Sequence, residues 1–208
     1  MLFVPGGFSG GDEPDGSGKF ITSFLRSGAA ADAVADLLDA RGGLVAGICN
    51  GFQALIKLGL VPYGRITEPD EHAPTLTFNT IGRHQSRLVR TRIASNMSPF
   101  LAETQIGDVF TVPISHGEGR FLCEEALLAE LIKNGQIATQ YVDMDGNPTM
   151  DIAHNPNGSV LAVEGITSPD GRVFGKMGHS ERIGRGLYKN VAGNYDIGMF
   201  RSAVKFFQ

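Results

Sequence analysis

Leu44-Val45-Ala46-Gly47-Ile48-Cys49-Asn50-Gly51-Phe52-Gln53 is the stretch that determines the fold class of this chain. Its first half is a short apolar run, typical of a strand buried on both faces of a sheet. A helical pattern over 53–58 follows and ends at Gly59. The Gly-x-Cys-x-Gly sequence between strand and helix predicts a nucleophile elbow, a sharp turn that lifts the cysteine clear of the sheet. We therefore expect an α/β domain built around Cys49.

The flanking sequence predicts further strands and helices. Short runs rich in β-branched and aromatic residues predict strands at 2–4, 109–114, 137–142, 160–166 and 172–177. Apolar periodicity predicts helices at 29–38 and 124–133. Two hairpins are expected, one joining 75–78 to 87–93 around Gly82 and one joining 160–166 to 172–177 through Pro169-Asp170-Gly171. With no repeat or long linker, residues 1–208 read as one domain with a mixed, mostly parallel sheet and helices on both faces.

Composition excludes several classes of protein. The 208 residues carry 18 Lys+Arg and 22 Asp+Glu, a net charge of -4, which argues against a nucleic-acid binder or a basic membrane-surface protein. Neither a signal peptide nor a membrane-spanning apolar run is visible. Two cysteines are too few for a disulfide scaffold or a four-cysteine zinc site, and the histidines lack metal-ligand spacing. We expect a soluble protein of a reducing compartment, the cytoplasm, without a metal.

Chemistry is predicted at Cys49. A thiol at the start of a helix, near an imidazolium, is expected to be partly ionised; the alternative is a buried cysteine that acts as a small apolar residue. His179 and Glu181 are two residues apart in an extended segment, so they point to one side and suggest a Cys49–His179–Glu181 triad. A solvated ion pair with Arg182 is the alternative for that segment. Backbone N–H groups of Asn50 and of the Gly6-Gly7-Phe8 stretch are candidates for an oxyanion hole.

Four segments together resemble one family. They are Pro5-Gly6-Gly7-Phe8-Ser9, Gly47-Ile48-Cys49-Asn50-Gly51-Phe52-Gln53, Ser115-His116-Gly117-Glu118-Gly119-Arg120-Phe121 and Gly178-His179-Ser180-Glu181-Arg182. Their order and spacing resemble the class I glutamine amidotransferase domain, in the form found in phosphoribosylformylglycinamidine synthase. The run Asn155-Pro156-Asn157-Gly158-Ser159 adds to the likeness, which covers essentially the whole chain.

The resemblance implies a function and a set of roles. Cys49 would attack the side-chain amide of glutamine, His179 would transfer protons, and Glu181 would orient the imidazole. The N–H groups of Gly7 and Asn50 match the oxyanion hole, and the positions that hold the amino-acid end of glutamine are matched by Gln53, Ser115, His116 and Gly117. Ammonia would pass to a synthetase domain that uses ATP and Mg to convert formylglycinamide ribonucleotide to formylglycinamidine ribonucleotide in purine biosynthesis. No cofactor is implied in this domain.

Two departures from the family accompany the resemblance. Many members have Pro where this chain has Ser180, so this segment is expected to be looser or held by a hydrogen bond of the hydroxyl. The family domain also begins about 40 residues earlier, judged from typical element lengths. We therefore expect an amino-terminally truncated domain that lacks its first strand, helix and strand and has an exposed sheet edge.

Other interpretations remain open. A stand-alone cysteine peptidase or hydrolase on an elbow fold usually has His directly after the Cys, and here that residue is Asn50. A non-catalytic, truncated partner-binding domain is the third hypothesis. Gly16-Ser17-Gly18-Lys19 lacks the residues of a phosphate-binding loop, so the 9–18 stretch is expected to be a surface loop near the mouth of the site. Cys123 is expected to be packed, and Arg83, Arg87, Arg90 and Arg92 to lie on a solvated hairpin or to dock the synthetase.

Overall fold

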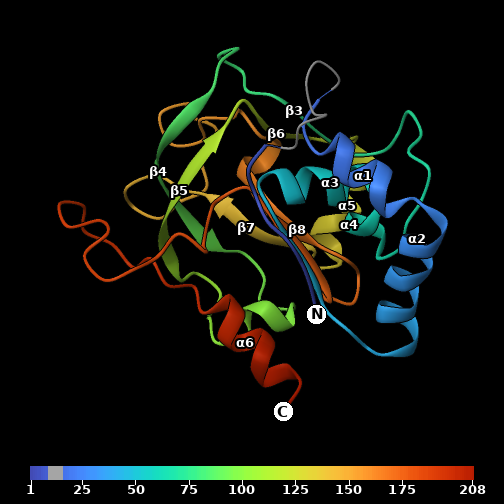
Figure 1. The fold of residues 1–208 in the computed structure, drawn as a ribbon. Coiled ribbons are helices and arrows are strands. Elements are labelled where there is room, and N and C mark those ends of the chain that lie inside the picture. The colour runs from blue at the N-terminus through green and yellow to red at the C-terminus, as the bar shows by residue number, and fades with distance from the viewer. Residues whose placement is uncertain (9–15) are drawn as a thin grey trace.

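The computed structural model describes residues 1–8 and 16–208, which form two sheets and their covering helices (Figure 1). The strands are β1 (Leu2–Val4), β2 (Val45–Ile48), β3 (Thr75–Phe78), β4 (Gln85–Ile93), β5 (Val109–His116), β6 (Glu118–Leu122), β7 (Ile137–Tyr141), β8 (Val163–Thr167) and β9 (Val173–Lys176). The α-helices are α1 (Lys19–Leu25), α2 (Gly28–Ala35), α3 (Asn50–Leu58), α4 (Leu60–Tyr63), α5 (Glu125–Lys133) and α6 (Met199–Phe206). None of the helices among the described residues is long and apolar enough to cross a membrane.

The large sheet is mixed and has the strand order β1-β2-β9-β8-β7-β4-β5. Strands β1, β2 and β9 pair in parallel, and the pairs from β9 to β5 are antiparallel. Alternating direction across those four pairs leaves β1, β2, β9, β7 and β5 pointing the same way. The carboxyl ends of β1, β2, β9 and β5 therefore face one edge of the sheet, where α/β proteins place their ligands.

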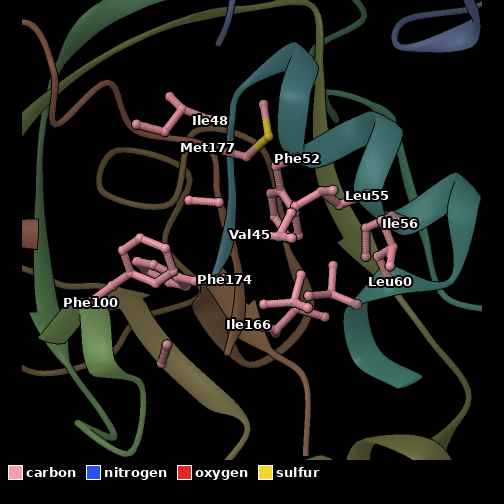
Figure 2. Packing of buried hydrophobic residues seen from close by; sticks show 14 of the residues in the cluster. Val45, Ile48, Phe52, Leu55, Ile56, Leu60, Phe100, Ile166, Phe174 and Met177 are labelled. Atoms are coloured by element: carbon pink, nitrogen blue, oxygen red, sulfur yellow. The ribbon is translucent and has the colours of Figure 1, made fainter. Parts of the chain in front are cut away.

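The core lies where α3 packs on the parallel strands. Every residue of β2 and β9 is buried, and the apolar side of α3 presents Phe52 and Leu55 to the sheet around Val45 and Ile166 (Figure 2). The helix approaches closely because Gly51 has no side chain: a Cβ there would lie 2.0 Å from Val4 O. This packing fixes the start of α3, and hence Cys49, against the ends of β1 and β2.

Helices cover both faces of the sheet, as predicted. Figure 1 shows α1 to α4 on one side and α6 on the other. The alternation of side chains in β1 is consistent with this, because Leu2 lies beside Phe24 of α1, while Phe3 packs edge-to-face on Phe200 of α6 with ring centroids 5.2 Å apart. In the described residues β1 pairs only with β2, so it forms the expected edge of the sheet.

The structure confirms most predicted elements and corrects one pairing. The strand of the elbow, the other predicted strands and the three predicted helices are present, although 160–162 forms a short 3₁₀ turn before β8. The predicted hairpin of 75–78 with 87–93 is wrong, because β3 pairs with β6 and β4 pairs with β5 and β7. Leu76, the buried residue of β3, is opposite the fully buried Phe121 of β6, so burial of that side chain selects the distant partner. The other predicted hairpin, β8 with β9, is confirmed.

Candidate active site

The turn after β2 has the predicted geometry of a nucleophile elbow. Cys49 has φ 55° and ψ -110°, a strained conformation for a residue with a side chain, and α3 begins at the next residue. Such a conformation costs of the order of 1–3 kcal/mol and persists only where neighbouring structure enforces it. Here the Cys49 N–H donates to Lys176 O at 2.9 Å and the Cys49 carbonyl accepts from Gln53 N at 3.0 Å. The turn is thus held by β9 on one side and α3 on the other.

The segment after β9 brings a histidine to the same place. His179 is 1% exposed, and its Nδ1 lies 2.6 Å from Glu181 Oε1. Its Nε2 has no hydrogen-bond partner among the described residues. The pairing of His179 with Glu181 therefore matches the prediction: the carboxylate fixes one ring nitrogen and leaves the other available.

Gly6 shows how close the histidine and the cysteine are. A Cβ on Gly6 would lie 2.6 Å from His179 Cε1 and 3.0 Å from Cys49 Cβ, so both side chains lie against the same glycine. Both also line one small pocket, which is bounded by Gly7, Phe8, Ser17, Cys49, Gln53, Ser115, His116, Gly117, His179 and Arg182. Three parallel strands and the residues that follow them thus bring Gly6, Cys49 and His179 together.

The far end of the sheet completes this pocket, because the sheet curls. Strand β5 is last in the strand order, yet Cys49 Sγ donates to Ser115 O at 3.7 Å. The His179 N–H donates to Pro113 O at 2.8 Å. These contacts close the sheet over the elbow and place the end of β5 against the sulfur.

The thiol of Cys49 is less acidic than the turn alone suggests. Burial raises the pKa of the thiol to about 11, which is the largest effect on it. The backbone N–H groups of Asn50 and Gly7 act in the opposite direction. Burial therefore acts against the partial ionisation that was expected of this thiol. The two N–H groups that oppose the shift are the pair expected for an oxyanion hole.

The residues expected around the substrate have unequal environments. Gln53 is buried and its Nε2 donates to Glu118 O. His116 is buried without a hydrogen-bond partner for its ring among the described residues, and burial lowers its pKa to about 3. Ser115 Oγ lies 3.1 Å from His84 Nε2, so its hydroxyl is engaged outside the pocket. Gly117 lines the pocket with its backbone. All four predicted positions are brought together at one wall.

Two pocket residues were absent from the sequence prediction. Ser17 and Arg182 both line the pocket, and Arg182 Nε lies 3.8 Å from Glu181 Oε1. Arg182 follows the His-x-Glu segment directly, which was the available signal. The expected surface loop at 9–18 falls mostly on residues 9–15, which lie outside the described residues.

Ser180 has the hydrogen bond that was expected in place of proline. Lys176 Nζ donates to Ser180 Oγ at 2.9 Å, and both side chains are buried. The segment between His179 and Glu181 is thus restrained by a side-chain contact instead of a ring.

The remaining candidates lie apart from the pocket. Cys123 is half-buried between β6 and α5, as predicted. Of the four arginines, Arg87 donates to Ala153 O at 2.7 Å and Arg90 to Asp143 O at 3.2 Å, so β4 anchors the 143–153 loop. Arg92 donates to Gln140 Oε1 at 3.1 Å, across the β4–β7 pair.

Comparison with known proteins places this site in a family. A family model described as a CobB/CobQ-like glutamine amidotransferase domain matches residues 1–207. The phosphoribosylformylglycinamidine synthase subunit PurQ of Methanococcus maripaludis is 37% identical over 183 residues, which cover 88% of this chain and 65% of that protein. The PurQ subunit of Aquifex aeolicus is 34% identical over 202 residues, covering 94% of this chain and 76% of that protein.

A solved structure agrees with these relatives. The structure of PurLQS from Thermotoga maritima matches all of this chain and 81% of the matched chain, with a TM-score of 0.70 and 26% sequence identity. The chain spans only about two thirds of the length of the Methanococcus relatives. The resemblance inferred from the motifs is confirmed. This chain belongs to the family of CobB/CobQ-like glutamine amidotransferase domains.

Proposed function

We propose that this chain hydrolyses glutamine to glutamate and ammonia through a thioester on Cys49. The observation that carries the proposal is the convergence of Cys49 and His179 on Gly6, with Glu181 at 2.6 Å from the second ring nitrogen of the histidine. A buried thiol, a free imidazole nitrogen and an orienting carboxylate are the three parts of a nucleophilic acyl-transfer site.

The proposed reaction begins from a neutral thiol. Because burial raises the pKa of Cys49 to about 11, its proton moves to His179 Nε2 as the sulfur attacks the amide carbon of glutamine. The carbonyl oxygen becomes an oxyanion, which the N–H groups of Gly7 and Asn50 stabilise. The imidazolium then protonates the departing nitrogen, and ammonia leaves behind a thioester.

Hydrolysis completes the cycle. Neutral His179 takes a proton from water, and the hydroxide attacks the thioester carbon. The carbon–sulfur bond breaks, glutamate leaves, and the proton returns to Cys49. Glu181 stays ionised throughout: burial raises the pKa of its carboxyl, but the hydrogen bond and charge of His179 outweigh this and hold that pKa below its usual value.

We propose that Gln53, Ser115, His116 and Gly117 hold the amino-acid end of glutamine. They line the same pocket as Cys49 and His179, and their side chains and backbone supply polar groups there. The pocket is small, so a peptide chain has little room, which disfavours a peptidase. An intact triad likewise disfavours a non-catalytic domain.

The wider role follows from the relatives. Because the PurQ proteins are named as subunits of phosphoribosylformylglycinamidine synthase, we propose that the ammonia serves that reaction on formylglycinamide ribonucleotide. ATP and Mg would be bound by the synthetase partner. We propose further that residues 1–208 form one glutaminase domain, and that the reaction takes place in the cytoplasm, which suits a free nucleophilic thiol.

Replacement of the nucleophile tests the proposal. Cys49→Ala in the full-length protein is expected to abolish glutamate formation, whereas synthesis with added ammonium salt in the presence of the synthetase partner is retained. Cys123→Ala is the matched control and is expected to leave both activities unchanged. Glutamine hydrolysis by Cys49→Ala at the wild-type rate would contradict the assignment, and loss of ammonia-dependent synthesis would contradict the division of roles.

A further inference from the structure

A fully buried ion pair lies beneath the segment that carries His179. Lys176, the last residue of β9, and Glu164, on the neighbouring β8, are 1% and 0% exposed, with Nζ and Oε1 3.2 Å apart. Neither residue lines the pocket, and neither has a part in the chemistry proposed above. We call these two residues the buried pair.

The buried pair holds the peptide groups next to His179. The Gly178 N–H donates to Glu164 Oε1 at 2.5 Å, and the Gly178 carbonyl accepts from Lys176 Nζ at 3.0 Å. Lys176 Nζ also donates to Ser180 Oγ at 2.9 Å. The residues before and after His179 are thus both restrained by one ammonium group.

Lys176 also contacts the other half of the site. Its carbonyl accepts the Cys49 N–H at 2.9 Å, so its backbone restrains the elbow while its side chain restrains the histidine segment. A displacement of Lys176 would therefore change the position of the imidazole relative to the sulfur. An error of about 1 Å in such a geometry costs on the order of 100-fold in rate.

Stability alone gives a weak reason for this arrangement. Removing two charges from water is costly, and well-packed apolar residues in place of a buried ion pair are often neutral or stabilising. Glu164 Oε2 also accepts from Thr139 Oγ1, so the carboxylate is fixed to β7 as well. These contacts hold the two side chains of the buried pair in one arrangement. That arrangement in turn restrains the segment that carries His179.

We propose that Lys176 and Glu164 are positioning residues that hold the His179 imidazole at its place beside Cys49. They act through their hydrogen bonds with Gly178 and through the hydrogen bond of Lys176 Nζ with the Ser180 hydroxyl. The inference rests on the proposed function for its kinetic consequence. The Lys176 side chain does not line the pocket, so the ammonium group acts through the segment that carries His179.

The test compares two variants of the full-length protein. Lys176→Met with Glu164→Gln removes both charges and keeps an acceptor for the Gly178 N–H; kcat for glutamine is expected to fall about 100-fold with KM little changed. Ser180→Ala removes one hydrogen bond, and a fall of about tenfold is expected. Ser202→Ala is the matched control, because Ser202 is a buried serine of α6 whose hydroxyl has no partner in the described residues.

A second measurement separates positioning from folding. The rate of Cys49 alkylation by iodoacetamide is followed against pH, together with thermal unfolding. If His179 is displaced, alkylation at neutral pH is expected to fall and its pH profile to move toward the ionisation of the thiol itself. The control is expected to keep the wild-type profile.

The outcomes decide between the two proposals. Wild-type kcat and an unmoved alkylation profile in a folded double variant would overturn the positioning role. If the double variant does not fold, Ser180→Ala tests that role by the same two measurements, and wild-type values in both would overturn it. Absence of glutaminase activity in the wild type would refute the proposed function, whereas the alkylation profiles would still test the effect of the buried pair on Cys49.

Discussion

The two cysteines of this chain have the same acidity and different surroundings. Burial raises the pKa of both Cys49 and Cys123 to about 11. At Cys49 the backbone N–H groups and the charge of Arg182 act against burial, the charge of Glu181 acts with it, and the imidazole of His179 lies alongside. At Cys123 burial is the one cause among the described residues. The proposed nucleophilic role of Cys49 therefore depends on a group that accepts its proton, because burial disfavours the thiolate at both cysteines.

The largest expected effect is selective labelling. A chloroketone analogue of glutamine is expected to form one adduct, at Cys49, because the pocket binds the analogue and His179 takes the proton. Peptide mass spectrometry identifies the modified residue. Cys49→Ala is expected to abolish labelling and Cys123→Ala to leave it intact, and an adduct at Cys123 alone would break the comparison.

Removal of the proton acceptor should make the two cysteines alike. With His179→Ala, glutamine hydrolysis is expected to fall by about 10²–10⁴-fold, the usual contribution of general base catalysis. Steady-state glutamate release measures this loss. Iodoacetamide should then modify Cys49 and Cys123 at similar low rates at pH 7; a Cys49 that stays faster would show that another group accepts its proton.

A steric change should separate the histidine from the sulfur without removing either. In Gly6→Ala the new methyl would lie 2.6 Å from His179 Cε1, so one side chain must move, and kcat is expected to fall about 100-fold. Gly28→Ala is the control, since a Cβ there has no atom within 4 Å among the described residues. Equal kcat in the two variants, from initial rates at saturating glutamine, would show that the contact with Gly6 does not set the geometry.

The smallest expected effect is on stability. It measures how far water is excluded from His116, which lines the same pocket as Cys49. Burial lowers the pKa of His116 from 6.5 to about 3, so between these values the unfolded chain binds a proton that the folded chain excludes. Stability from this residue is therefore full above pH 6.5 and is lost as pH falls toward 3, by about 2 kcal/mol between pH 6.5 and 5. Urea unfolding of wild type and His116→Asn at both pH values gives the difference, with His154→Asn as a control outside the pocket. Equal losses in wild type and His116→Asn would show that His116 is hydrated.

Local sequence was sufficient for the elbow and its neighbours. The glycines around Cys49, the apolar strand before it and the helix after it are all adjacent in the chain, and the short His179-x-Glu181 spacing fixes its own contact. The pairing of strands that lie far apart in the sequence was harder to predict. Strand β3 was assigned to β4 because they are close in sequence, whereas burial of Leu76 against Phe121 selects β6.

Some structural elements and site residues were hard to recognise from the sequence. The predictions did not include α1, α6 or β6, which are short and only partly buried. Lys176 and Glu164 were visible as single charges within apolar runs, yet sequence does not show that they face each other across β8 and β9. Arg182 was visible next to Glu181, but the sequence does not show that it lines the same pocket as Cys49.

By itself, the sequence determined the strained turn at Cys49 and the pairing of His179 with Glu181, because each depends on residues a few positions apart. It also determined the family, through motifs that are each short and local although they are spread along the chain. Tertiary structure alone decided that β5 closes over the elbow and that Lys176 holds both sides of the site. It also decided that burial raises the pKa of the Cys49 thiol. Acidity depends on how much water the whole fold removes around the sulfur, and that amount is set by segments far from Cys49 in the chain.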